Sequence, residues 1–291
     1  MPTLWRRNIM PNPKRKIDKT MLSIDNAESR GFLHRDYIAH CLRWTHVTKY
    51  LMNQKRYATA RVLDIGCGKE IPLAKLMHSS RMKPSEYYAV DVNKLTMPAQ
   101  FAKAGWQPKL AGSTDICTLG LKDFQEPPNT IVCFEVLEHV APEHARRMLG
   151  KIFELLEVEG TAFISTPCWD PDVGAANNHI NEMTYQALGA MIEDVGFGIR
   201  GHWGTFASIK DYKHMVETDP NLSYVFENFR EYYDTNYLAT IFAPMFPQHS
   251  RNCIWELTKT PTNHTWSRLF NSLPDIEGRW SSSEDWRQLC P

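Results

Sequence analysis

The feature that most constrains the fold of this chain is the segment formed by residues 61–68, RVLDIGCG. Its β-branched and apolar start is typical of a buried strand. The two glycines that follow allow a tight turn and the close approach of a ligand. Pro72 then stands where the first turn of a helix accepts proline. A strand, a glycine turn and a helix in this order indicate an α/β protein with a ligand site at the end of the strand.

Further apolar runs predict the rest of the sheet. Residues 87–90 form a second run that ends in Asp91, an acidic residue suited to accept hydrogen bonds from ribose hydroxyls. The dinucleotide fingerprint is incomplete, because Ile71 stands where it has a third glycine. These signals predict a site for a nucleoside cofactor. A third strand precedes Ser113. The remaining strands are predicted at residues 130–134, 161–167, 197–206 and 251–257. The main helices are predicted at residues 34–52, 143–156 and 184–195.

A second cluster of chemistry-bearing residues follows the fourth predicted strand. If a helical turn begins at Glu135, then Glu135, Glu138 and His139 stand at positions i, i+3 and i+4 and point the same way. They would converge at the carboxyl end of a strand, where open α/β sheets bind their ligands. Two carboxylates and an imidazole predict either a divalent-metal site or an acid/base cluster.

In their order along the chain, these segments resemble the class I S-adenosylmethionine (SAM)-dependent methyltransferases, whose first motif is matched by residues 63–68. The resemblance covers residues 58–205 and 251–259. It implies an enzyme with a Rossmann-like α/β sheet of seven strands, the seventh antiparallel, and SAM as the cofactor. It also implies a set of cofactor contacts: Asp64, Gly66, Cys67 and Gly68 at the methionine end, Asp91 at the ribose, Val92, Asp115 and Ile116 at the adenine, and Phe134 and Glu135 after the fourth strand.

A closer likeness is to methyltransferases in which the fourth strand is followed by Glu-x-x-Glu-His and the fifth ends in Ser/Thr-Pro before a further histidine. Here residues 135–139 read EVLEH, residues 165–167 read STP, and His179 follows. The ubiquinone-biosynthesis O-methyltransferases and the small-RNA 3′-terminal 2′-O-methyltransferases look like this, and they hold magnesium beside the substrate hydroxyls. The likeness implies O-methylation assisted by Mg²⁺ or Mn²⁺, with four catalytic residues that are also metal ligands: Glu135, Glu138, His139 and His179.

Two other interpretations of this motif stay open. The same pattern occurs in relatives that use no metal, where the histidine is a general base or has a structural role. Ligand type does not settle the ion either, because carboxylates favour Mg²⁺ or Mn²⁺ whereas two imidazoles also suit Zn²⁺ or Fe²⁺.

The charge balance of the chain limits the classes of substrate that we expect. The formal net charge of the 291 residues is zero, so the chain lacks the global basic footprint of a nucleic-acid binder, although basic residues crowd its amino terminus. We therefore expect a small-molecule or nucleoside-like substrate. The alternatives are a phage-like methyltransferase acting on nucleic acid or a modified base, and an inactive SAM-binding scaffold subunit.

Length and composition predict one domain with additions. We expect a basic arm over residues 1–33, a methyltransferase domain over residues 34–259 and a tail over residues 260–291. Residues 207–250, rich in Tyr and Phe, are predicted to form one or two helices as a cap over the substrate, with an oligomerisation surface or a small satellite core as the alternative. The seven cysteines form no CxxC pair and no apolar run has the length of a membrane span, which predicts a cytoplasmic protein with free thiols and no membrane partner.

Overall fold

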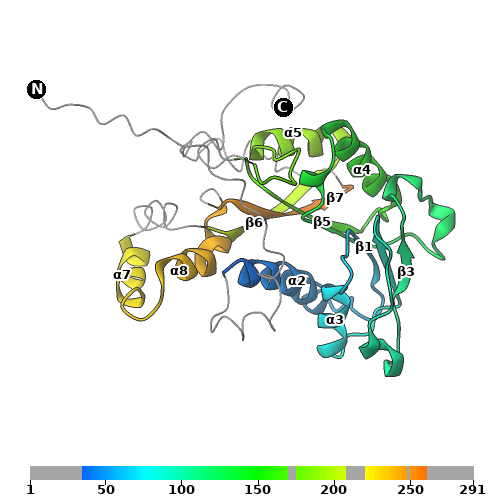
Figure 1. Cartoon of the computed structure of the whole chain (residues 1–291), viewed down its shortest axis with the longest axis horizontal. Helices are drawn as coiled ribbons and strands as arrows, with labels where there is room; N and C mark the ends of the chain where they lie inside the picture. The colour runs from blue at the N-terminus through cyan, green and yellow to red at the C-terminus, as the bar shows by residue number, and fades with distance from the viewer. Residues whose placement is uncertain (1–34, 170–174, 208–219, 248–249, 261–291) are drawn as a thin grey trace, which may run out of the picture.

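The computed structural model describes residues 35–169, 175–207, 220–247 and 250–260, which form a seven-stranded sheet with helices on both faces (Figure 1). The strand order is β3-β2-β1-β4-β5-β7-β6. Only β7 runs antiparallel to its neighbours among the described strands, so the predicted Rossmann-like methyltransferase sheet is confirmed. The strands are β1 (Arg61–Ile65), β2 (Glu86–Asp91), β3 (Lys109–Gly112), β4 (Thr130–Phe134), β5 (Thr161–Pro167), β6 (Gly198–Phe206) and β7 (Asn252–Thr258).

Two pairs of helices cover the two faces of the sheet (Figure 1). Side chains alternate along a strand, so Val62 of β1 packs into the core under the first pair while Leu63 and Ile65 pack under the second. The first pair is α2 (Arg35–Asn53) and α3 (Pro72–Ser79), and the second is α4 (Pro142–Leu155) and α5 (Tyr185–Val195). Short 3₁₀ turns lie at η2 (Ala99–Lys103), η3 (Ile116–Thr118), η4 (Leu121–Asp123), η5 (Leu137–His139) and η6 (Ala243–Met245).

Helix ends follow their local sequence signals. Thr184 caps α5, because its hydroxyl accepts a hydrogen bond from the Ala187 N–H at 3.1 Å. Gly196 ends the same helix with φ 105°, a left-handed conformation that favours glycine. Pro72 lies in the first turn of α3 as predicted. These residues therefore set the borders of the helices that flank the predicted site.

The insertion between β6 and β7 contains two helices, α7 (Pro220–Phe229) and α8 (Thr235–Phe242), which lie beyond β6 at the edge of the sheet (Figure 1). The prediction of one or two helices in this segment is confirmed. Phe226, Leu238 and Phe246 belong to a small core of their own, and α8 also packs against α2 and β6. Tyr224 and Tyr232 are exposed. Residues 208–219 and 248–249 lie outside the described residues, and the role of the insertion as a substrate cap stays a prediction.

The predicted arm and nearly all of the predicted tail also lie outside the described residues. The domain limits therefore stay predictions. Within the described ranges, all six cysteines are free thiols. No helix in those ranges combines the length and the apolar character that crossing a membrane requires.

Candidate active site

The carboxyl ends of β1, β2 and β4 meet at one edge of the sheet. β1 lies between the other two in parallel register, with Ile65 opposite Val90 on one side and Cys133 on the other. The residues that follow each strand are therefore neighbours in space. This register brings the glycine turn, Asp91 and Phe134 together, as the sequence predicts.

Different structural constraints act on the two glycines of the turn. Both are left-handed, with φ 65° at Gly66 and 67° at Gly68. A Cβ on Gly66 would lie 2.2 Å from the Val136 Cγ2 atom, whereas a Cβ on Gly68 would meet nothing within 4 Å. Gly66 thus lets the turn pack against the segment after β4, and Gly68 borders open space that a ligand can enter. Cys67 between them is buried.

Asp91 ties the glycine turn to the end of β2. Its Oδ2 atom accepts a hydrogen bond from the Gly68 N–H at 3.0 Å, and Oδ1 accepts from the backbone and side-chain nitrogens of Asn93 at 2.8 and 2.9 Å. A carboxylate oxygen accepts more than one hydrogen bond, so Oδ2 keeps capacity for a ribose hydroxyl.

Asp64 is buried and has a partner that the sequence reasoning missed. The Tyr87 hydroxyl donates a hydrogen bond to Asp64 Oδ2 at 2.6 Å. Burial raises the pKa of Asp64 to about 7, although the Tyr87 hydrogen bond acts in the opposite direction. Tyr87 carries no local signal of this contact, because the contact depends on the register between β1 and β2.

The predicted adenine contacts lie in the connections after β2 and β3. Val92 is 72% exposed and Ile116 is buried. Asp115 caps the η3 turn by accepting a hydrogen bond from the Cys117 N–H at 2.9 Å, and it faces His144 of α4. The geometry is therefore compatible with a structural role of Asp115 as the cap of this turn as well as with a contact to a cofactor.

Glu135 does not begin a helical turn, so that prediction is wrong. Its φ of 58° is left-handed, and the η5 turn begins only at Leu137. The reversal points its carboxylate toward β5 and β7 instead of along the turn. There it accepts hydrogen bonds from the Ser165 hydroxyl at 2.7 Å and from the Asn252 side-chain nitrogen at 2.9 and 3.0 Å.

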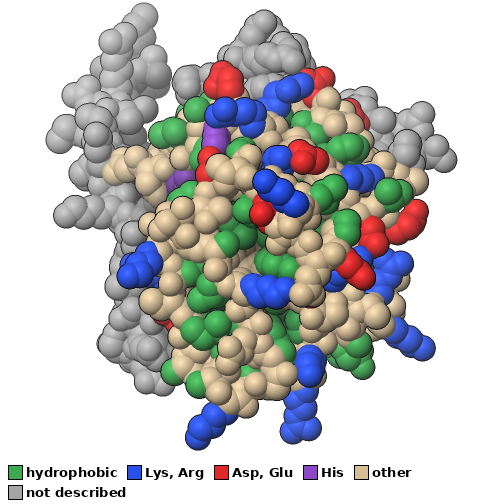
Figure 2. All heavy atoms as spheres, turned by 90° about the vertical axis from the view of Figure 1, so that its right-hand side faces the viewer, with side chains coloured by type: hydrophobic (Ala, Val, Ile, Leu, Met, Phe, Trp, Pro, Cys, Tyr) green, Lys and Arg blue, Asp and Glu red, His purple; other side chains and the backbone are tan. Residues whose placement is uncertain are grey.

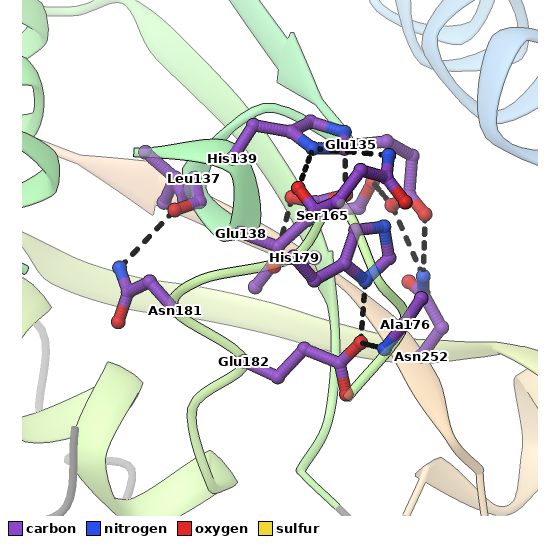
Figure 3. Close-up of polar contacts among 12 residues, drawn as sticks. Glu135, Leu137, Glu138, His139, Ser165, Ala176, His179, Asn181, Glu182 and Asn252 are labelled. Carbon is purple, nitrogen blue, oxygen red and sulfur yellow. Dashed lines mark hydrogen bonds and ion pairs between the residues drawn. The ribbon is translucent and has the colours of Figure 1, made fainter. Parts of the chain in front are cut away.

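The other three predicted metal ligands lie together (Figure 3). Glu138 and His139 belong to η5, and His179 comes from the segment between β5 and α5. One ligand atom from each lies within 4.8 Å of the others. His139 Nε2 is 3.8 Å from Glu138 Oε1, and the two imidazole rings are 4.8 Å apart between centroids.

Both imidazoles are oriented by their Nδ1 atoms. His139 Nδ1 donates a hydrogen bond to the Asn178 carbonyl oxygen at 2.9 Å, and His179 Nδ1 bonds the Glu182 carboxylate (Figure 3). Each ring therefore keeps Nε2 for a metal ion or a proton. Carbonyl and carboxylate partners of this kind are typical of metal-binding histidines.

The segment that carries His179 is fixed to the η5 turn. The backbone N–H groups of Ile180 and Asn181 donate to the Glu138 carbonyl oxygen at 2.8 and 3.1 Å, and the Asn181 side chain donates to the Leu137 carbonyl oxygen at 3.1 Å. Because Asn181 is fully buried, these bonds hold the two segments in one arrangement.

Comparison with known proteins identifies the family. Residues 33–217 match a family described as a methyltransferase domain. The chain belongs to the class I SAM-dependent methyltransferases. It is therefore a methyltransferase, and SAM is the cofactor of its family.

Among curated proteins, none matches this methyltransferase significantly. Solved structures are similar to it at low identity. Magnesium protoporphyrin IX methyltransferase from Synechocystis PCC 6803 with bound SAM has 16% identity and a TM-score of 0.48, over 78% of this chain and 82% of that chain. The Burkholderia thailandensis 1,6-didemethyltoxoflavin-N1-methyltransferase has 14% identity and a TM-score of 0.47, over 81% and 83%. The small RNA methyltransferase HEN1 has 13% identity and a TM-score of 0.48, over 76% of this chain and 26% of that chain.

Arg43 of α2 is a charged residue of this methyltransferase site that the sequence did not predict. Its side chain is 2% exposed, and its Nη2 atom lies 3.7 Å from Glu135 Oε2 and 2.6 Å from His40 Nδ1. Burial raises the pKa of Glu135, but Arg43 and the hydrogen bonds from Asn252 and Ser165 outweigh it, so that pKa is lowered. The sequence does carry a signal for this residue, because Arg43 is a charged residue within the apolar face of the helix predicted at residues 34–52.

The pKa of Glu138 is shifted in the opposite direction to that of Glu135. Its side chain is 1% exposed, and the neighbouring His139 imidazole, whose Nε2 atom lies 3.8 Å from Glu138 Oε1, is charged only when protonated. Burial, and then the charge of Glu135, raise the pKa of Glu138 well above its usual value, although the Thr166 hydroxyl donates to it at 3.1 Å. A buried carboxylate beside two imidazoles fits a divalent cation, which would supply the missing positive charge.

A hollow of about 510 Å³ lies at the opposite edge of the sheet and does not belong to this site. Arg61, Asn129 and Glu157 line it near the amino ends of β1, β4 and β5. Arg61 is already paired with Glu126 and Glu157 at 3.0 and 2.9 Å, so we assign the hollow no chemistry.

Proposed function

We propose that this methyltransferase transfers the methyl group of SAM to a hydroxyl oxygen, and that a divalent ion held by Glu138, His139 and His179 assists the reaction. The observation that supports the proposal is the joint orientation of these side chains. Both Nδ1 atoms are bonded to oxygen acceptors, and one ligand atom of each ring lies within 4.8 Å of a ligand atom of the buried Glu138 carboxylate.

The cofactor contacts predicted from the sequence are part of the proposal. Asp91 would hold the ribose, and Asp64 and Gly68 would face the methionine end of SAM. The β1–β4 register places this turn next to the segment that carries Glu138. The methyl group would therefore lie between the glycine turn and the imidazoles, in line with a hydroxyl held there.

The bound ion would lower the pKa of a coordinated hydroxyl and so generate an oxygen nucleophile near neutral pH. The residues of the chain provide the positioning. Glu182 and the Asn178 carbonyl fix the two rings, and Thr166 fixes Glu138. Arg43 neutralises Glu135, so that carboxylate supports the site without being one of the grouped ligands.

We propose a small molecule or a nucleoside end with neighbouring hydroxyls as the acceptor. Two hydroxyls can share one cation, which suits a site with three protein ligands. The zero net charge supports a small acceptor over a long nucleic acid. On the face seen in Figure 2, Lys and Arg side chains are dispersed among Asp and Glu and do not form one basic groove.

A second mechanism is supported by the same imidazole. His139 Nδ1 donates to a carbonyl oxygen, so Nε2 carries the lone pair and can accept a proton from a substrate hydroxyl. In that mechanism His139 is a general base and no metal takes part. Metal dependence separates the two mechanisms.

The test is methyl transfer by the full chain from SAM labelled in its methyl group. The acceptors are a catechol and a short RNA with a free 3′-terminal ribose, each paired with an analogue that lacks the reactive hydroxyl. We expect label in one intact acceptor, loss of transfer with a chelator, and recovery with Mg²⁺ or Mn²⁺. Glu138→Gln should reduce transfer by about 100-fold or more at unchanged SAM affinity. Transfer that persists in chelator and in Glu138→Gln but is lost in His139→Ala would support the general base instead.

A further inference from the structure

A second group of possible metal-ligand side chains lies after the carboxyl end of β3 and in α4. Asp115 is the N-cap of the η3 turn after β3, Cys117 lies in that turn, and His144 lies in the first turn of α4. One ligand atom from each lies within 4.8 Å of the others, and all three residues are half-buried. They are therefore reachable from solvent, and two secondary-structure elements hold them.

The geometry of this second group is set by the backbone. The Cys117 N–H donates to Asp115 Oδ1 at 2.9 Å, which fixes the carboxylate and leaves Oδ2 facing α4. Oδ2 lies 3.3 Å from His144 Nε2. Two ligands of one ion, each about 2.0–2.2 Å from it, are separated by a distance of this size.

We propose that Asp115, Cys117 and His144 form a second metal site, selective for Zn²⁺ or Co²⁺, whose occupation weakens the binding of SAM. Thiolate and imidazole ligands suit these ions, whereas Mg²⁺ requires oxygen ligands. Three protein ligands leave one tetrahedral position for water. The effect on SAM rests on the proposed role of Asp115 at the adenine.

Proton movements accompany the binding of an ion. Arg147 donates to His144 Nδ1 at 2.9 Å, so the Nε2 atom of the neutral ring carries the proton. An ion at Nε2 requires that proton to move to Nδ1, which breaks the Arg147 hydrogen bond, and it requires the Cys117 thiol to release its proton to solvent. Arg147 is exposed and can turn away. Replacing it by Ala should therefore tighten the binding of the ion.

Occupation of the site would engage both carboxylate oxygens of Asp115. Oδ1 already accepts the Cys117 N–H, and Oδ2 would bind the ion. The ion would draw negative charge from the carboxylate and so weaken its hydrogen bond with the exocyclic amine of adenine. The expected result is competition between the ion and SAM.

Co²⁺ absorption spectroscopy on the full chain tests the site. A thiolate bound to Co²⁺ gives a sulfur-to-metal charge-transfer band in the near ultraviolet, and the Glu138, His139 and His179 group has no sulfur that could produce it. We expect the band in the unaltered chain and in His179→Ala, and its loss in Cys117→Ser. Cys41→Ser, which removes another half-buried thiol, should keep the band. A band that survives Cys117→Ser, or no band at all, would overturn the site.

The effect on the cofactor is measured by calorimetric titration of SAM with and without Zn²⁺. We expect Zn²⁺ to raise the apparent Kd of SAM about 10-fold or more, and Cys117→Ser to remove the effect. Arg147→Ala should lower the Zn²⁺ concentration needed. Unchanged SAM affinity in Zn²⁺ would overturn the competition. Neither readout depends on methyl transfer, so a failure of the proposed O-methylation would remain distinguishable.

Discussion

Glu135 and Glu138 are three residues apart, and the structure provides a permanently charged arginine beside Glu135 but only an imidazole beside Glu138. Arg43 lies 3.7 Å from Glu135, whereas Glu138 has His139 at 3.8 Å. The pair formed by Arg43 and Glu135 joins α2 to the end of β4. In our account this pair therefore stabilises the position of the site, and Glu138 is the carboxylate that remains able to bind a metal ion.

Arg43→Met should destabilise the fold, because it leaves Glu135 near His40 without its main counter-charge. Removing one member of a buried pair costs roughly 3 kcal/mol. Arg146→Met is the matched control, since Arg146 and Asp194 are also 3.7 Å apart but are 46% and 45% exposed. Its cost should be less than about 1 kcal/mol. Urea unfolding measures both, and equal losses in the two variants would show that burial of Arg43 has no special effect.

The two glycines of the turn should respond differently to Ala. Both substitutions strain a left-handed backbone, by roughly 1 kcal/mol. Gly66→Ala also forces its Cβ onto Val136, so it should lower the unfolding temperature much more than Gly68→Ala. Gly68→Ala should mainly weaken SAM binding, because its Cβ enters the space proposed for the cofactor. Calorimetry with SAM checks this, and normal SAM affinity in Gly68→Ala would place the cofactor elsewhere.

At the scale of elements, local sequence signals sufficed where an element is defined by its own residues. The Thr184 cap, the Gly196 end and the run of residues 61–65 predict α5 and β1 within one residue. They failed at Glu135, whose conformation depends on Ser165 and Asn252, two partners on other strands. Arg43 and Tyr87 were missed for the same reason, because their partners are set by the sheet register and by the docking of α2.

The insertion between β6 and β7 should behave as a small separate core. Phe226 is fully buried in it, whereas Tyr224 is 73% exposed. Phe226→Ala removes a buried aromatic ring and should lower the free energy of unfolding by roughly 3 kcal/mol or more. The loss of stability should be confined mainly to α7 and α8. Hydrogen exchange should speed up in those helices and stay slow in β1 and β4. Tyr224→Ala should leave exchange unchanged, and faster exchange throughout the sheet in Phe226→Ala would contradict an independent core.

At the scale of the whole molecule, the half-buried His46 connects stability to pH. Burial lowers the pKa of His46, which packs against Phe163 and Trp203, from 6.5 to about 4. The unfolded chain therefore binds the proton first, so this residue contributes stability above pH 6.5 that is lost as the pH falls toward 4. The pKa of Asp64 is raised to about 7, so its contribution has the opposite sign and is lost as the pH rises toward 7.

The contribution of His46 is isolated by comparing the unaltered chain with His46→Leu. Between about pH 7.5 and pH 5, the unaltered chain should lose roughly 1–3 kcal/mol more unfolding free energy than the variant. Urea unfolding at the two pH values measures the difference. Parallel pH profiles would show that His46 is protonated equally in the folded and unfolded chains.

The central claim is that a divalent ion binds Glu138, His139 and His179 beside the SAM site of this methyltransferase. Calorimetric titration of Mn²⁺ into the SAM-bound chain tests it most directly, with the double variant His139→Ala, His179→Ala as the comparison. We predict saturable binding of Mn²⁺ to the unaltered chain and its loss in the double variant, at unchanged affinity for SAM. Equal Mn²⁺ binding in both proteins, or none in the unaltered chain, would contradict the account.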